Sequence, residues 1–375
     1  MKKKICFVVS SAMTVNAFLQ QPIRSLSEYY DVYIALNLKP GESLHGLEDL
    51  VTVLPVGIER KASPWRDLVT LWQLVRLFRL YRFNLIHSVT PKAGLLGMMA
   101  AFLSGVDIRI HTFTGQVWVT RCGLVRWMLK SIDRLIALLA TRTLVDSASQ
   151  RQFLLDEGVL DQAFSDVLAQ GSISGVYVSR FKPDAEARSR IRNELRIPDD
   201  DTIFLFLGRL NRDKGVLDLA SAFAGLDDGR THLLVVGPDE GQLRQQIQQI
   251  TSGCAERVHF VEFTTRPEEY MAASDVLCLP SYREGFGSVV IEAAAAGIPA
   301  IGSRIYGVVD AIAENYSGLL FEARDVFALR TCLSVLANDR PRRIQLGRQA
   351  YQRALAEFSS ERLASAWLEF YQARL

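Results

Sequence analysis

Short apolar runs alternate with stretches of helical periodicity along nearly the whole chain of 375 residues. This alternation predicts open parallel β-sheets with helices on both faces, because a strand that is buried on both faces must be apolar along its length. The fold class is therefore α/β. In the first half we expect strands at 5–9, 31–35, 51–54, 84–88, 108–112 and 143–146.

A second series of apolar runs begins at TIFLFLG. There we expect strands at 202–208, 232–237, 258–263, 275–280, 298–303 and 318–323. Two series of six strands predict two Rossmann-like domains, which agrees with the usual length of about 100 to 200 residues per domain. Residues 171–201 between the series are expected to form a linker, with a hinge near 171–182, and then a lead-in helix.

Composition excludes several classes of protein. The net charge is +2, and residues 1–170 carry 19 Lys/Arg against 14 Asp/Glu, so an anionic partner is expected at the N-terminal half. No lysine-rich tract is present, and nucleic acid is not an expected partner. The five cysteines are widely spaced, and this pattern is typical of reduced thiols in a cytoplasmic protein. The longest uncharged apolar run, 93–106, is shorter than the about 20 residues that span a bilayer.

The segment FLFLGRLNRDKG places Gly208, Arg209 and Lys214 between the end of a strand and the start of a helix. Two cations beside a helix N-terminus suit a diphosphate whose charge no metal neutralises. The alternative is an ordinary solvated turn with Lys214 at the surface.

The segment SYREGFGSVVIEAAAAG follows another expected strand. Gly285 and Gly287 let the backbone approach a ligand closely. The N–H groups of Phe286, Gly287 and Ser288 form a second anion-binding surface, and the Ser288 side chain is expected to cap the helix.

Two carboxylates flank this glycine loop. Glu284 in the loop can accept hydrogen bonds from sugar hydroxyls, and Glu292 on the helix can accept both hydroxyls of a ribose. The alternatives are that Glu284 only complements a helix dipole and that Glu292 is an exposed helix residue. Glu292 stands among VVI and AAAA, where an unpaired charge would be unfavourable, so a binding role is favoured.

Together these motifs resemble the family-four retaining nucleotide-sugar glycosyltransferases, which have the GT-B fold. TPKAGLLG, GSISGV and FKP extend the resemblance over nearly the whole chain. It implies that Arg209 and Lys214 hold the donor diphosphate, that Glu284 holds the donor sugar and that Glu292 holds the ribose. The loop that ends at Arg266 would border the base.

The resemblance also implies that an acceptor-binding domain, residues 1–175, faces a donor-binding domain, residues 183–358, across a cleft. The final helix, 360–375, would pack back on the first domain. A front-face retaining mechanism needs no general base, since an oxygen of the departing phosphate can take the acceptor's proton. Catalysis would then depend on preorganised positive charge, and no metal or other cofactor is expected.

The expected acceptor side departs from the family pattern. Its first loop lacks the family's glycines, and Ser11 and Thr14 either offer hydroxyls to a ligand or cap the next helix. Thr114 stands where many relatives have histidine. His111 is expected in a strand as a core histidine, so no general base is assigned. Lys92, at a helix start, would meet the diphosphate of a lipid-linked acceptor.

Two basic amphipathic segments with aromatic residues, 67–83 and 121–142, either lie on an anionic membrane or simply cover the sheet. Because relatives act on undecaprenyl-diphosphate-linked acceptors, the membrane interpretation is favoured.

We therefore expect a cytoplasmic enzyme at the inner face of the membrane that transfers an N-acetylhexosamine-type sugar from a UDP-sugar to a polyprenyl-diphosphate-linked glycan. It would serve lipopolysaccharide, O-antigen, capsule or other surface-polysaccharide synthesis. The alternatives are a nucleotide-sugar epimerase of the same fold and a noncatalytic donor-binding subunit.

Overall fold

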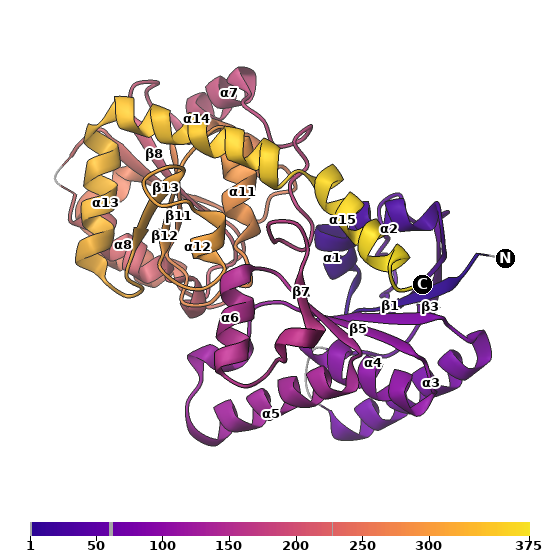
Figure 1. Ribbon diagram of the computed structural model, residues 1–375. Helices are drawn as coiled ribbons and strands as arrows, with labels where there is room; N and C mark the ends of the chain where they lie inside the picture. Colours follow the sequence, from indigo (N-terminus) through magenta and orange to yellow (C-terminus); the bar gives the residue numbers. More distant parts are fainter. Residues whose placement is uncertain (1, 60–62, 227) are drawn as a thin grey trace. The chain divides into compact units, whose positions relative to one another are not determined.

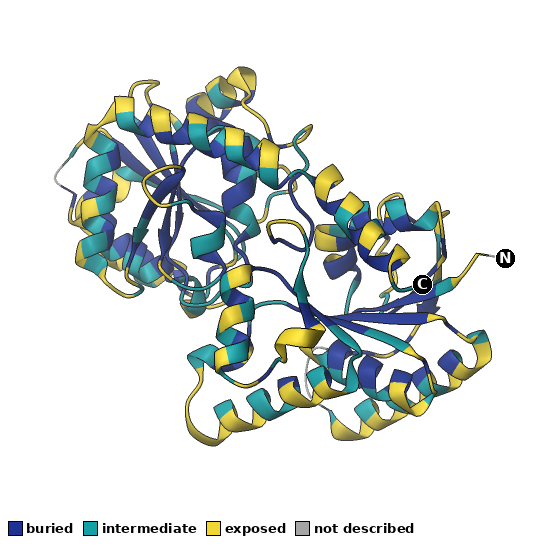
Figure 2. Cartoon of the chain, in the orientation of Figure 1, coloured by how far each residue is buried: buried dark blue, intermediate teal, exposed yellow. Residues whose placement is uncertain are grey.

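The computed structural model describes residues 2–59, 63–226 and 228–375, and the chain divides into two compact units (Figure 1). The first unit comprises Met1–Gly175 with Ser360–Leu375, and the second comprises Val176–Ser359. Each unit is built around one parallel sheet whose strands are buried beneath helices with exposed outer faces (Figure 2).

The first sheet has the strand order β3-β2-β1-β4-β5-β6-β7, and all of its pairs are parallel. The expectation of six strands in this half is wrong, because the described residues contain a seventh, β7. It is a three-residue edge strand with the polar sequence SDV, which leaves no apolar run to detect. The strands are β1 (Lys4–Val8), β2 (Asp31–Leu36), β3 (Val51–Pro55), β4 (Leu85–Val89), β5 (Ile108–Phe113), β6 (Arg142–Val145) and β7 (Ser165–Val167).

Helices cover both faces of this sheet. One face packs on α2 and α15 through a core that includes Phe7, Ile23 and Trp367, and the other packs on α3, α4 and α5. The elements are α1 (Ala12–Thr14), the π-helical turn η1 (Val15–Leu19), α2 (Gln20–Ser27), α3 (Pro64–Tyr81), α4 (Pro91–Leu103), η2 (Val117–Thr120), α5 (Gly123–Leu139), α6 (Ala148–Asp156), η3 (Gln162–Phe164) and α15 (Ser360–Gln372).

The second sheet has the order β10-β9-β8-β11-β12-β13 and is also parallel. Most residues of its apolar runs are buried, as in continuous hydrophobic strands of a parallel sheet, whereas the edge strand β10 is only partly buried. Its strands are β8 (Thr202–Leu207), β9 (Thr231–Val236), β10 (Val258–Val261), β11 (Val276–Leu279), β12 (Ala300–Ser303) and β13 (Gly318–Phe321).

Helices α10, α11 and α14 cover one face of the second sheet, and α8, α9 and α13 cover the other. Helix α7 packs against α10. The elements are α7 (Ala185–Leu195), η4 (Arg212–Lys214), α8 (Val216–Ala224), α9 (Arg244–Ile250), η5 (Ser252–Arg257), α10 (Pro267–Ala273), α11 (Ser288–Ala295), α12 (Val308–Ala311), α13 (Val326–Asn338) and α14 (Arg340–Glu357).

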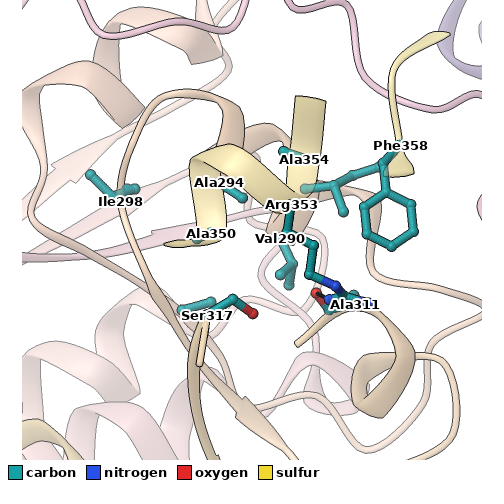
Figure 3. Close-up of a pocket in the computed structure, with 11 residues that line it drawn as sticks. Val290, Ala294, Ile298, Ala311, Ser317, Ala350, Arg353, Ala354 and Phe358 are labelled. Carbon is teal, nitrogen blue, oxygen red and sulfur yellow. Dashed lines mark hydrogen bonds between the residues drawn. The ribbon is translucent and has the colours of Figure 1, made fainter. Parts of the chain in front are cut away.

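The alanines of α11 let it pack closely on α14. A cavity of about 10 Å³ remains between these helices, room for at most one water molecule (Figure 3). Val290, Ala294 and Ala350 line it, and Arg353 reaches past it to donate to the Ala311 carbonyl at 2.7 Å. This face of α11 is therefore fixed by packing, and the start of the helix is held in place for the preceding loop.

None of the helices in the described part of the chain combines the length and the apolar character that crossing a bilayer requires.

Candidate functional site

Two loops of the second unit lie side by side at the carboxyl edge of its sheet. One follows β8 and contains η4, and the other runs from the end of β11 to the start of α11. β8 and β11 are paired neighbours in the sheet, so the loops that follow them are adjacent. The carboxyl edge is where ligands bind in open α/β sheets.

Lys214 from the first loop and Glu284 from the second form an ion pair. The Lys214 Nζ atom lies 2.5 Å from Glu284 Oε1, and the Ser281 hydroxyl donates to the same oxygen at 2.7 Å. The two charged side chains are 22% and 13% exposed, so the pair is only partly screened by water. The fold thus brings together two residues that are 70 positions apart and that the sequence singled out.

Backbone contacts hold the two loops at a close distance. The Tyr282 N–H donates to the Asp213 carbonyl at 2.8 Å. Gly215 has a φ of +65°, and a Cβ at this position would lie 1.9 Å from the Pro280 carbonyl oxygen. Only glycine satisfies both conditions, the left-handed conformation and the close approach.

The N-terminus of α11 is formed by glycine backbone. Gly287, with a φ of +82°, occupies the N-cap position, so the expectation that Ser288 caps the helix is wrong: Ser288 is its first residue. A Cβ on Gly307 would lie 2.3 Å from the Gly285 carbonyl oxygen, which shows how tightly the next loop is packed. The Phe286 side chain is buried against Phe358, which leaves only its backbone for a ligand.

Glu292 lies one turn inside α11. The residue retains some exposed surface, yet the burial of its carboxyl group raises the pKa to about 7, and the charge of Arg180 only partly offsets this effect. A carboxyl group with such a pKa is partly protonated near neutrality, and partners that donate hydrogen bonds to the ionised form would favour its ionisation.

The other donor-side candidates have separate surroundings. Gly208 directly follows β8 and donates from its backbone N–H to the Val236 carbonyl at 2.9 Å. Arg209 forms an exposed pair with Glu240 at 3.1 Å. Arg266, at the N-cap of α10, pairs with Glu269 at 3.1 Å and is mostly exposed. The structure therefore joins Lys214 to Glu284 directly, whereas Arg209 and Arg266 contact other partners.

In the first unit, Ser11 occupies the N-cap position of α1, and its hydroxyl lies 3.4 Å from that of the largely buried Thr14. Lys92, in the first turn of α4, pairs with Asp67 of α3 at 2.6 Å. Both loops follow strands of the first sheet, β1 and β4, which are paired neighbours.

His111 lies within β5, where its Nδ1 atom is 2.8 Å from the buried Ser88 hydroxyl. Burial lowers the pKa of His111 to about 3, so the imidazole is neutral at ordinary pH. Thr114 follows the strand, and its carbonyl accepts hydrogen bonds from Gln116 and Gln150. The buried, hydrogen-bonded state of His111 is that of a core residue.

Sequence reasoning missed several residues around the Lys214–Glu284 pair. The Tyr282 hydroxyl donates to Asp218 on α8 at 2.7 Å, and Arg283 pairs with Asp213 at 3.3 Å. No periodicity marks such residues, because polar side chains in a loop and on a helix surface look like ordinary solvated groups. Among the described residues, no group of three or more His, Cys, Asp or Glu side chains is arranged to hold a metal ion.

Comparison with protein families assigns both units. Residues 187–353 match the family described as "Glycosyl transferases group 1", and residues 28–163 match the family described as "Glycosyl transferase 4-like domain". Together the two matches cover most of the chain.

Three known proteins illustrate the similarity. The chain is 26% identical to the capsular polysaccharide biosynthesis glycosyltransferase CapM of Staphylococcus aureus, over 84% of this chain and 82% of that protein. It is 24% identical to the N,N'-diacetylbacillosaminyl-diphospho-undecaprenol alpha-1,3-N-acetylgalactosaminyltransferase of Campylobacter jejuni, over 98% of both chains. The crystal structure of Anabaena HepE in complex with UDP superposes with a TM-score of 0.82 at 19% identity, over the full length of both chains.

Proposed function

The chain belongs to the group 1 glycosyl transferases and has their GT-B fold, and from this premise we propose that it transfers a sugar from a UDP-sugar to a polyprenyl-diphosphate-linked glycan with retention of configuration. The observation that carries the proposal is the contact between Lys214 and Glu284 at the adjoining ends of β8 and β11. It combines a cation for a phosphate with a carboxylate for sugar hydroxyls in one place.

In this proposal, donor binding separates Lys214 from Glu284, and each of the two side chains contacts the donor instead. The diphosphate takes Lys214 as its counterion, with Arg209 and the backbone N–H groups of Gly287 and Ser288 as further donors. Glu284, released from Lys214 but still hydrogen-bonded to Ser281, accepts hydroxyl groups of the sugar. Once the donor is bound, the positive charge of Lys214 and Arg209 stabilises the departing diphosphate, an oxygen of which takes the proton of the acceptor hydroxyl.

Glu292 and Arg266 complete the donor site. Glu292 accepts the two ribose hydroxyls, since one carboxylate can accept two hydrogen bonds at once. The loop that ends at Arg266 follows β10, two strands from β8 in the sheet, and it borders the base.

The first unit binds the acceptor. Ser11, Thr14, Lys92 and Thr114 follow strands β1, β4 and β5 at the carboxyl edge of its sheet. The lipid diphosphate meets Lys92, which must then leave Asp67 as Lys214 leaves Glu284. An N-acetylhexosamine as the transferred sugar is supported by the similarity to a relative named as an N-acetylgalactosaminyltransferase.

The same unit is proposed to lie on the cytoplasmic face of an anionic membrane, as an enzyme of surface-polysaccharide synthesis would. Helices α3 and α5 flank α4 in one layer, and each exposes large apolar side chains, among them Trp72, Leu80, Trp127 and Leu138. The only acids in these two described helices are Asp67, which is paired with Lys92, and the buried Asp133. An exposed apolar surface with a net positive charge fits an anionic lipid surface.

The test is a panel of UDP-sugars incubated with the purified chain and with lipid-linked saccharides, followed by mass spectrometry of the lipid product. Transfer by the wild type, and its loss in Glu284→Ala, would support the proposal. Two other outcomes identify the alternatives: an epimerase converts the donor when no acceptor is present, and a donor-binding subunit binds UDP-sugar but never releases UDP.

A further inference from the structure

The Tyr282 side chain links the two proposed donor loops through α8. Its hydroxyl donates to Asp218 Oδ2 at 2.7 Å, and Asp218 lies in the first turn of α8, directly after the loop that carries Lys214. Burial, and then the neighbouring Asp218, raise the pKa of Tyr282 to about 12. The phenol therefore remains protonated and remains a donor over the whole range in which an enzyme works.

Two further contacts fix the orientation of this tyrosine. Its backbone N–H donates to the Asp213 carbonyl at 2.8 Å, so the main chain is held at the same place as the side chain. The guanidinium carbon of Arg324, from the loop after β13, lies 4.5 Å from the centre of the Tyr282 ring. A cation at this distance attracts the face of the ring.

These contacts lie beside both groups of the proposed donor site. Lys214 follows Asp213 in the chain, and Glu284 is two residues beyond Tyr282. The separation between Lys214 and Glu284 therefore depends on how the loops are joined at Tyr282. In the transfer reaction this separation must match the distance between the diphosphate and the sugar hydroxyls, and errors of about 1 Å in such placements can lower rates about 100-fold.

We propose that Tyr282 and Asp218 form a positioning pair, which holds the loop of Glu284 against the loop of Lys214 so that the sugar and the diphosphate of one donor molecule are aligned for transfer. The proposal rests on the proposed function. Neither residue contacts the donor: each acts through the placement of its neighbours.

A positioning role and a purely structural role predict different kinetics. If Tyr282→Phe only weakens the fold, the melting temperature and the fraction of active molecules decrease, but kcat per donor-binding site does not change. If the pair positions the donor, kcat per binding site decreases about 10- to 100-fold while KM for the UDP-sugar changes by less than about threefold, because the nucleotide contacts remain.

The experiment measures kcat, KM and binding stoichiometry for Tyr282→Phe, Asp218→Ala and the double variant. We expect the double variant to be no slower than either single variant, since all three lose the same hydrogen bond. Asp218→Asn should stay within about threefold of the wild type because its amide oxygen still accepts the hydrogen bond. Tyr316→Phe, which removes a hydroxyl from an exposed tyrosine of the same unit, is the matched control.

The possible results separate this inference from the proposed function. A wild type that transfers no sugar from any donor overturns the function, and the positioning pair with it. An active wild type with an unchanged kcat in Tyr282→Phe overturns only the positioning pair. Additive effects in the double variant would overturn it as well, because they would show that the two residues act separately.

Discussion

Lys214 Nζ lies 2.5 Å from Glu284 Oε1, so the cation and the carboxylate proposed to bind opposite parts of the donor neutralise each other when no donor is bound. Both side chains are largely buried, and each would be poorly solvated without its partner. Donor binding is then an exchange of counterions, in which Lys214 leaves the Glu284 carboxylate and pairs with the donor diphosphate.

The exchange predicts opposite effects of two substitutions on UDP binding. Lys214→Ala should weaken UDP binding about 10-fold or more, because a charge-assisted contact to phosphate is lost. Glu284→Gln should bind UDP at least as tightly as the wild type, because Lys214 no longer has to leave a carboxylate, although it should lose sugar transfer. Calorimetric titration with UDP measures both.

The matched control for this pair is Glu314→Gln. It neutralises the carboxylate of an exposed pair with Arg304, also 2.5 Å long and in the same unit, and should leave UDP affinity unchanged. Weaker UDP binding by Glu284→Gln would contradict the exchange.

Gly215→Ala tests the close approach of the two loops. The new Cβ would lie 1.9 Å from the Pro280 carbonyl oxygen at a φ of +65°, so the loops must separate. We expect transfer to fall about 100-fold and the melting temperature to decrease. Gly253→Ala, where a Cβ meets no atom within 4 Å, is the control. Wild-type kinetics in Gly215→Ala would show that the loop spacing is unimportant.

The sequence predicts the framework of this site better than its contacts. TIFLFLG reveals β8 because a strand buried on both faces is apolar throughout, whereas the polar edge strand β7 has no such signal. The sequence motifs single out Glu284 and Lys214. The ion pair between these two residues, and the Tyr282–Asp218 hydrogen bond, depend on how segments 64 to 70 residues apart in the chain meet, which no local pattern encodes. The prediction that Ser288 caps α11 is wrong because Gly287 occupies the N-cap position.

The raised pKa of Glu292 predicts that donor affinity depends on pH. Burial raises the pKa of its carboxyl group to about 7, and the ionised form, with an acceptor oxygen for each ribose hydroxyl, binds the ribose better than the protonated form, which turns one oxygen into a donor. The affinity for a UDP-sugar should therefore increase as the pH rises from 6 to 8, by about 10-fold at most. A UDP-sugar is the suitable ligand, because the terminal phosphate of UDP itself titrates near pH 6.

Glu292→Gln should bind more weakly at pH 8 and show no such dependence. Stability gives an independent check. A carboxyl group whose pKa is raised from 4.5 to about 7 by folding stabilises the fold below pH 4.5, and this contribution is lost as the pH rises to 7. The melting temperature of Glu292→Gln relative to the wild type should thus increase between pH 5 and 8. A constant difference would refute the raised pKa.

Tyr371 of α15 should stabilise the first unit through His87. The tyrosine hydroxyl lies 2.6 Å from His87 Nδ1, both side chains are fully buried, and Thr112 lies 2.7 Å from the other ring nitrogen. Tyr371→Phe leaves the buried Nδ1 atom of His87 without its hydrogen-bond partner, which should lower the free energy of unfolding by about 1 to 3 kcal/mol. Its melting temperature should fall by several degrees, at about 2 to 4 °C per kcal/mol. The exposed Tyr29→Phe is the control, and equal melting temperatures would contradict the expectation.

The exposed tryptophans of α3 and α5 predict how the chain meets a membrane. Trp72 and Trp127 are each more than 60% exposed, so both helices present an aromatic surface, and on α3 the Arg76 guanidinium lies 5.7 Å from the centre of the Trp72 ring. Trp72→Ala combined with Trp127→Ala should weaken binding to phosphatidylglycerol vesicles about 10-fold or more, because apolar area buried in the interface is lost.

Wild-type binding should also weaken with added salt, since the basic residues act through screened charge. Phe327→Ala removes an even more exposed aromatic side chain from α13 of the second unit and should leave vesicle binding unchanged. If the double tryptophan variant binds vesicles as the wild type does, the surface of α3 and α5 is not the one that contacts lipid.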